Sequence, residues 1–149
     1  MSLEFDESVA KVERLLRHVA FIIKKRGREI LEDFEITNPQ FNALLTLREH
    51  PDITMGELCE KLFLACSTAT DLIDRLEKNG YLERRRDPQD RRVIRLSISD
   101  KGRHVISEVI AARRRYVASI LKQLSQEEID RLAESLEKLH SLMFAENVV

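Results

Sequence analysis

The chain contains 149 residues, of which 43% are hydrophobic and 34% are charged, and this length and composition are expected of one soluble globular domain. Its 25 lysines and arginines nearly balance 26 aspartates and glutamates, so any binding of nucleic acid has to depend on where the charges lie. Four glycines, three prolines and no tryptophan disfavour collagen-like, disordered and turn-rich all-β chains and favour long helices. No apolar run approaches the roughly 20 residues that span a bilayer.

The N-terminal segment and the cysteines indicate the compartment. The first seven residues are acidic and contain neither the basic region nor the apolar core of a secretory signal, so we expect a cytoplasmic protein with no membrane partner. Cys59 and Cys66 lie seven residues apart with no second pair and no histidine cluster, which fits neither a disulfide framework nor a zinc site. Both are expected to be reduced thiols.

Most of the chain has the periodicity of amphipathic helices, with apolar residues spaced by three and four. This pattern predicts helices over about 7–34, over 38–49, from 54, over 66–79, from 99 or 100 to about 124, and from 125 onwards. Capping boxes support three of these starts, because Thr37, Thr54 and Ser125 are each followed three residues later by glutamine or glutamate. Gly80 marks the end of the 66–79 helix, since glycine enters the left-handed conformation at little cost.

A β-hairpin is predicted after this glycine. Residues 81–86 and 93–98 flank the turn-forming sequence Asp87-Pro88-Gln89-Asp90, and the second run alternates apolar with polar residues. The order of short helix, tight turn, second helix, glycine and hairpin is typical of a winged helix-turn-helix. The sequence therefore predicts a mainly α-helical fold with a small β-hairpin wing, in a single domain over residues 1–149.

The 66–79 helix has two faces that suit a helix in the major groove of DNA. Ala69, Leu72 and Leu76 are expected to pack on the scaffold, while short polar side chains on the opposite side meet base edges and phosphates. Ten basic and five acidic residues lie between Arg75 and Arg103, so this stretch carries +5 and the rest of the chain −6. Such a surplus is expected of a hairpin that neutralises phosphates, although a solvated hairpin without a partner is the simpler alternative.

Five stretches in the middle third of the chain have a family-specific character. They are Thr54-Met55-Gly56-Glu57-Leu58, Ser67-Thr68-Ala69-Thr70, Asp74-Arg75-Leu76-Glu77-Lys78-Asn79-Gly80-Tyr81-Leu82-Glu83-Arg84, Asp87-Pro88-Gln89-Asp90-Arg91-Arg92 and Leu96-Ser97-Ile98-Ser99-Asp100-Lys101-Gly102. Together they resemble the MarR-type transcriptional regulators. The combination of the Asp-Arg-Leu segment with Asp-Pro-x-Asp-Arg-Arg is specific to that family, and the flanking helices match in length and order.

The resemblance implies a sequence-specific regulator that binds double-stranded DNA and represses or activates nearby genes, with a repressor released by a small phenolic or anionic effector as the favoured case. It implies a homodimer on a pseudo-palindromic operator, with residues 35–100 as the DNA-binding part and residues 5–34 and 101–149 as long dimerisation helices. The wide apolar sides of those helices independently favour a second subunit, since the remaining chain is too short to cover them. A thiol-based redox sensor is the alternative regulator, and a metal sensor is a less favoured one.

The resemblance and the charge pattern also assign DNA contacts. The helix from Ser67 to Lys78 is expected in the major groove and Arg92 in the flanking minor groove. The full set of expected contacts is Ser67, Thr68, Thr70, Asp71, Arg75, Lys78, Arg84, Arg86, Arg91 and Arg92. Carboxylates facing DNA are repelled unless they are paired, so Asp74 and Asp90 are expected to brace arginines, with Asp90 holding Arg75 or a wing arginine. Direct base reading stays open for Asp71.

Other kinds of site are less well supported. An effector crevice is expected between the dimerisation helices and the DNA-binding part, lined by His18, Phe21, Phe41 and Leu45. Catalysis is not predicted, because the chain has no Ser-His-Asp order and no glycine-rich phosphate loop. The four histidines lack the i, i+4 spacing of helical metal ligands, so neither a metal nor another cofactor is expected. The arginines of the hairpin disfavour a module that binds only protein.

The cysteines are expected to be structural rather than redox-sensing. Cys66 starts the recognition helix, where the helix dipole favours a thiolate, but the helical wheel places it at the edge of the apolar side near Ala69 and Ile73. A small buried thiol is the usual occupant of such a position. Thiol-sensing members of the family carry the reactive cysteine near the start of the first helix, which has none here.

Overall fold

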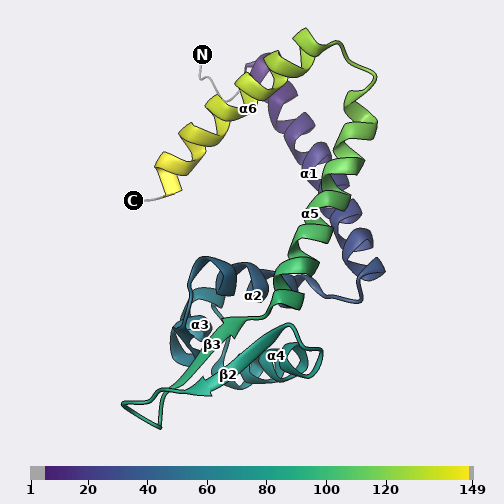
Figure 1. Ribbon diagram of the computed structural model, residues 1–149. Coiled ribbons are helices and arrows are strands. Elements are labelled where there is room, and N and C mark those ends of the chain that lie inside the picture. Colours follow the sequence, from purple (N-terminus) through teal and green to yellow (C-terminus); the bar gives the residue numbers. More distant parts are fainter. Residues whose placement is uncertain (1–5, 148–149) are drawn as a thin grey trace. The chain divides into compact units, whose positions relative to one another are not determined.

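The computed structural model describes residues 6–147. The cytoplasmic location was expected from the acidic first seven residues, and most of these lie outside the described residues. Within that range the chain forms six helices and a small sheet (Figure 1). The elements are α1 (Glu7–Asp33), α2 (Asn38–Glu49), β1 (Ile53–Thr54), α3 (Met55–Leu62), α4 (Cys66–Lys78), β2 (Leu82–Arg86), β3 (Ile94–Ile98), α5 (Asp100–Leu121) and α6 (Gln126–Asn147). The predicted fold class, mainly α-helical with a small β wing, is confirmed.

The chain forms two compact units, Met1–Ala111 and Ala112–Val149, and the boundary between them lies within α5. The first unit holds α1 to α4, the sheet and the beginning of α5. The expected single domain, with a DNA-binding part over 35–100 between dimerisation helices, stays a prediction. Among the helices of the described range, none has the length and apolar character needed to cross a membrane.

The predicted capping residues lie at the starts of their helices and form hydrogen bonds there. Thr37 forms both bonds of its capping box with Gln40, at 3.0 and 3.3 Å, and Thr54 accepts a bond from the Glu57 amide at 3.1 Å. Ser125 and Glu128 form the third box, in which the carboxylate accepts from the Ser125 amide and hydroxyl. These bonds satisfy amides that the first helical turn leaves without an intrahelical partner. The predicted starts are confirmed within a residue, whereas α5 ends at Leu121 rather than near residue 124.

The sheet has a strand that the sequence does not reveal. Its three strands lie in the order β1-β3-β2, both pairs antiparallel. The β1 strand is only two residues long, with Ile53 opposite Leu96 and Thr54 opposite Arg95. A prediction of a two-stranded hairpin was therefore incomplete, because two residues are too few for an alternating pattern. The added strand follows α2 in the chain and pairs with β3, so it attaches the end of α2 to the hairpin.

Side chains from α2, α3, α4, β3 and the beginning of α5 form the hydrophobic core. Its fully buried members include Leu44, Leu58, Ile73, Leu76, Leu96 and Ile106. The expectation that Leu72 packs on the scaffold was only partly right, because Leu72 is half-buried and Ile73 is fully buried. On a helix with about 100° per residue, Ala69, Ile73 and Leu76 lie on one line, while Leu72 lies about 60° to its side. The polar face of α4 is thereby turned to solvent.

A polar junction joins the end of α4 to the start of α5. Gly80, at φ 81°, closes α4 as predicted, and the Tyr81 amide bonds to the Leu76 carbonyl at 2.9 Å. The Ser99 hydroxyl donates to the Gly80 carbonyl at 2.6 Å, and Lys101 Nζ donates to the Asn79 carbonyl at 2.7 Å. These bonds satisfy carbonyls at the end of α4 and fix the hairpin beside that helix.

Candidate nucleic-acid interface

The exposed face of α4 carries the predicted contact residues, with one exception. Ser67, Thr68 and Lys78 are exposed. Asp71 and Arg75 are also exposed, and they form an i, i+4 ion pair at 3.4 Å. Thr70 is half-buried, and its hydroxyl donates to the Cys66 carbonyl at 2.7 Å. Its hydroxyl hydrogen is therefore already used within the helix, whereas the other polar groups face solvent.

Two carboxylates of α4 hold one arginine of β2. Arg84 forms an ion pair with Asp74 and a second one with Glu77 at 3.3 Å. The Arg84 side chain is only 25% exposed. The expected bracing role of Asp74 is thus confirmed, and its partner is Arg84. This geometry favours a clamp between α4 and the wing as the function of Arg84, and its predicted contact with DNA stays a prediction.

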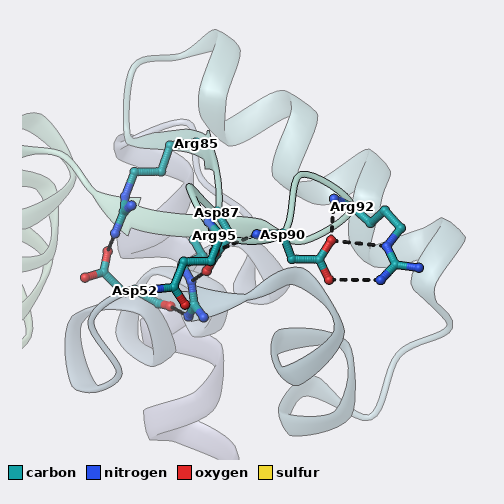
Figure 2. A network of polar contacts seen from close by, with 7 residues as sticks. Asp52, Arg85, Asp87, Asp90, Arg92 and Arg95 are labelled. Carbon is teal, nitrogen blue, oxygen red and sulfur yellow. Dashed lines mark hydrogen bonds and ion pairs between the residues drawn. The ribbon is translucent and has the colours of Figure 1, made fainter.

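The base of the wing is held by a network of aspartates and arginines, shown in Figure 2. The Asp52 carboxylate accepts from Arg85 at 2.7 Å, and the Asp52 carbonyl accepts from Arg95 at 2.9 Å. The Arg95 guanidinium also donates to the Asp87 carboxylate at 2.6 Å. The loop before β1 is therefore bonded to both long strands of the hairpin. Charge-assisted bonds of this kind are shorter and stronger than neutral ones.

The turn at the wing tip is closed by two aspartates. Asp87 accepts bonds from the Gln89 and Asp90 amides at 2.8 and 3.1 Å, as an aspartate at the start of a turn commonly does. Asp90 accepts from Arg92 Nε at 3.1 Å and from Arg92 Nη2 at 3.3 Å, and also from the Arg92 amide. The prediction that Asp90 holds a wing arginine is confirmed. Arg92 holds the pKa of Asp90 below its ordinary value, through the hydrogen bond between their side chains.

The arginines at the wing tip are exposed to solvent. Arg92 is 90% exposed even though Asp90 binds its guanidinium, and Figure 2 shows the pair at the end of the hairpin. Arg91 is exposed, and Arg86, also exposed, donates to the Arg91 carbonyl at 2.8 Å. A guanidinium that is oriented in advance and still solvated on its other edge is suited to insertion into a narrow minor groove.

Acid is expected to weaken the wing through Asp87. The bonds from Arg95 and from the turn amides hold the pKa of the Asp87 carboxyl below its ordinary value. A carboxylate with a lowered folded pKa stabilises the fold fully above the unfolded pKa, about 3.9, and this contribution is lost as pH falls through the folded pKa. Asp87→Asn should therefore flatten the fall of the thermal midpoint between about pH 5 and pH 3. Circular dichroism measures that slope.

Glu83→Gln on the same wing is the matched control, because Glu83 is an exposed carboxylate on β2. It should keep the wild-type slope over the same pH range. If Asp87→Asn and wild type lose stability equally on acidification, the Arg95 contact does not contribute to the acid sensitivity of the fold.

The two cysteines differ in exposure. Cys59 is buried, whereas Cys66 is exposed, so the expectation of a buried thiol at the start of α4 was wrong. Cys66 is the first residue of α4, and the buried line of the helix begins at Ala69. Burial, together with a hydrogen bond to Cys66, raises the pKa of the Cys59 thiol to about 11. Cys59 is therefore a protonated, poorly nucleophilic thiol at neutral pH, and the structural role expected of both cysteines stays a prediction.

The residues expected around an effector differ widely in burial. His18 and Phe21 are exposed on α1, Phe41 is buried in the core, and Leu45 on α2 is half-buried. A crevice lined by these four side chains stays a prediction. Within residues 6–147, no group of three or more histidine, cysteine, aspartate or glutamate side chains is arranged to hold a metal ion.

These observations define a class of protein, a winged helix-turn-helix with a polar recognition helix and an arginine-rich wing. A family model described as MarR family matches residues 36–94. The regulator YsmB of Bacillus subtilis, an uncharacterized HTH-type transcriptional regulator, is 49% identical over 137 residues, which are 92% of this chain and 94% of YsmB. The transcriptional repressor MdtR of the same organism is 33% identical over 121 residues, covering 79% of this chain and 78% of MdtR.

A solved structure agrees with these relatives. A MarR family protein from Bacillus stearothermophilus superposes with a TM-score of 0.78 at 48% identity, covering 92% of this chain and 96% of that chain. The chain therefore belongs to the MarR family of transcriptional regulators.

Proposed function

We propose that the protein binds a pseudo-palindromic site in double-stranded DNA as a homodimer and thereby regulates transcription. In each subunit α4 enters the major groove and the wing tip lies against the flanking minor groove. One observation carries this proposal: a single compact unit presents both the polar face of α4 and the exposed arginines of the wing tip. The stretch from Arg75 to Arg103, which includes the wing, has ten basic and five acidic residues, and a local surplus of positive charge favours binding through the release of phosphate counterions.

The side chains divide the binding between phosphates and bases. Ser67 and Thr68 in the first turn of α4 are short enough for the backbone to approach base edges, and Arg75 and Lys78 follow on the same exposed face. Lysine and arginine contacts to phosphates position a protein without reading sequence, while contacts to base edges specify it. Specificity is therefore assigned to the first turn of α4, and most of the affinity to the arginines and lysines.

The apolar surface of the long helices supports the dimer. On α1 the exposed large hydrophobic residues are Val12, Leu15, Leu16, Val19, Phe21, Ile22 and Ile23. On α6 they are Leu132, Leu136, Leu142, Met143 and Phe144. Contiguous apolar patches of this extent are uncommon on monomers and mark interaction surfaces. A second copy of the chain is the partner that would cover both helices.

Footprinting and light scattering test this function together. The full-length protein is incubated with the DNA upstream of its own gene, and the protected bases are mapped. Two half-sites are expected, with centres about one helical turn, ~34 Å, apart or slightly more, together with a dimeric mass at micromolar concentration. Protection of one half-site only, or a monomeric mass, would contradict the dimeric mode of binding, and no protection would contradict operator binding at that region.

The direction of control is proposed to be repression relieved by a small phenolic or anionic molecule. The related protein MdtR is named as a transcriptional repressor, which supports repression, and the effector rests on family resemblance. Adding phenol or an aromatic carboxylate to the preformed complex, with anisotropy of labelled operator as the readout, measures release. Release at concentrations that leave the dimer intact is the expected result.

A further inference from the structure

One aromatic side chain of the helix-turn-helix is almost fully exposed to solvent. Phe63, in the turn between α3 and α4, is 95% exposed. The other strongly exposed large apolar residues of the described range lie on α1, α5 and α6 or in the α5–α6 connection. The apolar faces assigned to the proposed dimer therefore do not include Phe63, and its exposure needs another explanation.

The backbone at Phe63 makes a phenylalanine there more unusual. Its φ of 54° and ψ of 37° are left-handed, a conformation that costs energy for a bulky residue. The Phe63 amide bonds to the Glu60 carbonyl and the Leu64 amide bonds to the Cys59 carbonyl, both at 3.2 Å. This pair of bonds is a Schellman motif, in which glycine is the favoured residue. The phenyl ring thus contributes neither to the core nor to the turn.

Phe63 lies close in sequence to the recognition helix. Only Leu64 and Ala65 separate it from α4, whose first residues Cys66 and Ser67 are exposed. In a helix-turn-helix the N-terminal residues of the second helix are the ones that contact base edges. Phe63 is therefore an exposed apolar residue only three positions before the first turn of α4, which the proposed function places in the major groove.

We propose that Phe63 packs against the C5-methyl group of a thymine in the major groove and so contributes to the choice of operator sequence. This inference rests on the proposed function, since it requires α4 to enter the groove. The thymine methyl is the apolar group that base pairs present there, and phenylalanine is among the side chains that contact it. The contact removes from water an apolar ring that the free protein leaves exposed.

Replacement of thymine by deoxyuridine tests the contact, because deoxyuridine keeps the base pair and lacks only the methyl group. Each thymine of the footprinted operator is replaced in turn, and the Kd of the full-length wild type and of Phe63→Gly is measured by fluorescence anisotropy. At one thymine per half-site, deoxyuridine should weaken wild-type binding roughly fourfold, the effect of one buried methyl. The same replacement should leave the Kd of Phe63→Gly unchanged. Such a difference between the two proteins would show that the thymine methyl contacts the Phe63 ring.

Glu35 offers a matched control for the backbone. It has φ 57°, and its amide bonds to the Glu32 carbonyl while the Ile36 amide bonds to the Leu31 carbonyl, the same closing pattern at the end of α1. Phe63→Gly and Glu35→Gly should both keep or raise the thermal midpoint, because glycine relieves the left-handed conformation. Only Phe63→Gly should weaken operator binding.

Equal sensitivity of both proteins to deoxyuridine at every thymine would overturn the inference, and so would an unchanged operator affinity of Phe63→Gly. Either result leaves the proposed function standing, because wild-type binding is measured in the same experiment. If the wild type protects no upstream DNA and binds none in solution, the proposed function and the inference both fail.

Discussion

Replacing Gly102 by alanine is expected to destabilise the winged helix by ~3 kcal/mol or more, at the upper end of the effects of overpacking. Gly102 is buried near the start of α5. A Cβ built there would collide with the carbonyl oxygen of Tyr81 and lie 2.7 Å from Cγ1 of Ile98. The Tyr81 carbonyl cannot easily move away, because it accepts a hydrogen bond from the Ser99 amide at 3.0 Å. The gain in helix propensity from glycine to alanine, about 1 kcal/mol, is too small to offset the collision.

Gly56→Ala is the matched control, since Gly56 lies within α3 and a Cβ there meets nothing within 4 Å. It should raise stability by up to about 1 kcal/mol. Urea unfolding followed by circular dichroism compares both variants with wild type. Equal stability of Gly102→Ala and wild type would show that the junction between α5 and the end of α4 relaxes at little cost, contrary to the packing seen at Tyr81.

Helix starts could be predicted because their signals are local. At Thr37 and Ser125, the capping residue and its partner three positions later determine the bond, so the sequence pattern and the structure describe the same contact. Gly80 is similar, since a left-handed residue after a helix favours glycine. Signals within one turn do not depend on the rest of the fold, and these boundaries were accordingly predicted within about a residue.

Features that depend on distant residues could not be predicted in the same way. The Asp52 to Arg85 ion pair joins residues 33 positions apart, and β1 exists only because β3 lies beside Ile53 and Thr54. Cys66 is exposed although it lies only about 20° from the buried Ile73 around α4, because it is the first residue of the helix and the buried residues begin at Ala69. A helical wheel gives the angles of residues around one helix, but it does not show how far along the helix its packing partner extends.

The candidate DNA contacts lie between these two cases. Their exposure on α4 and at the wing tip follows from the amphipathic pattern and from the turn, and most of them are exposed as expected. Whether an arginine points outward or inward depends on the carboxylates near it. Arg84 and Arg92 are both wing arginines, yet two carboxylates of α4 hold the first while Asp90 holds the second at the exposed tip. Charge count alone does not separate the two roles.

Arg92→Ala is expected to weaken operator binding by ~1–3 kcal/mol and to lessen its salt dependence. The side chain is 90% exposed and bonded to Asp90, so truncation removes a positioned cation from the wing tip without opening the core. The thermal midpoint should therefore stay close to that of wild type. Fluorescence anisotropy of labelled operator over a series of salt concentrations measures both the affinity and the slope of log Kd against log salt.

Arg91→Ala is the control for the loss of one positive charge, because Arg91 is an exposed arginine of the same turn. Both variants lose one positive charge, but the carboxylate of Asp90 orients the guanidinium of Arg92. If that orientation matters, Arg92→Ala should cost more affinity than Arg91→Ala, and Asp90→Asn should lower the affinity although it removes a negative charge from the interface. Unchanged affinity in Arg92→Ala, together with a loss in Arg91→Ala, would show that Arg91 is the arginine of the wing that enters the minor groove.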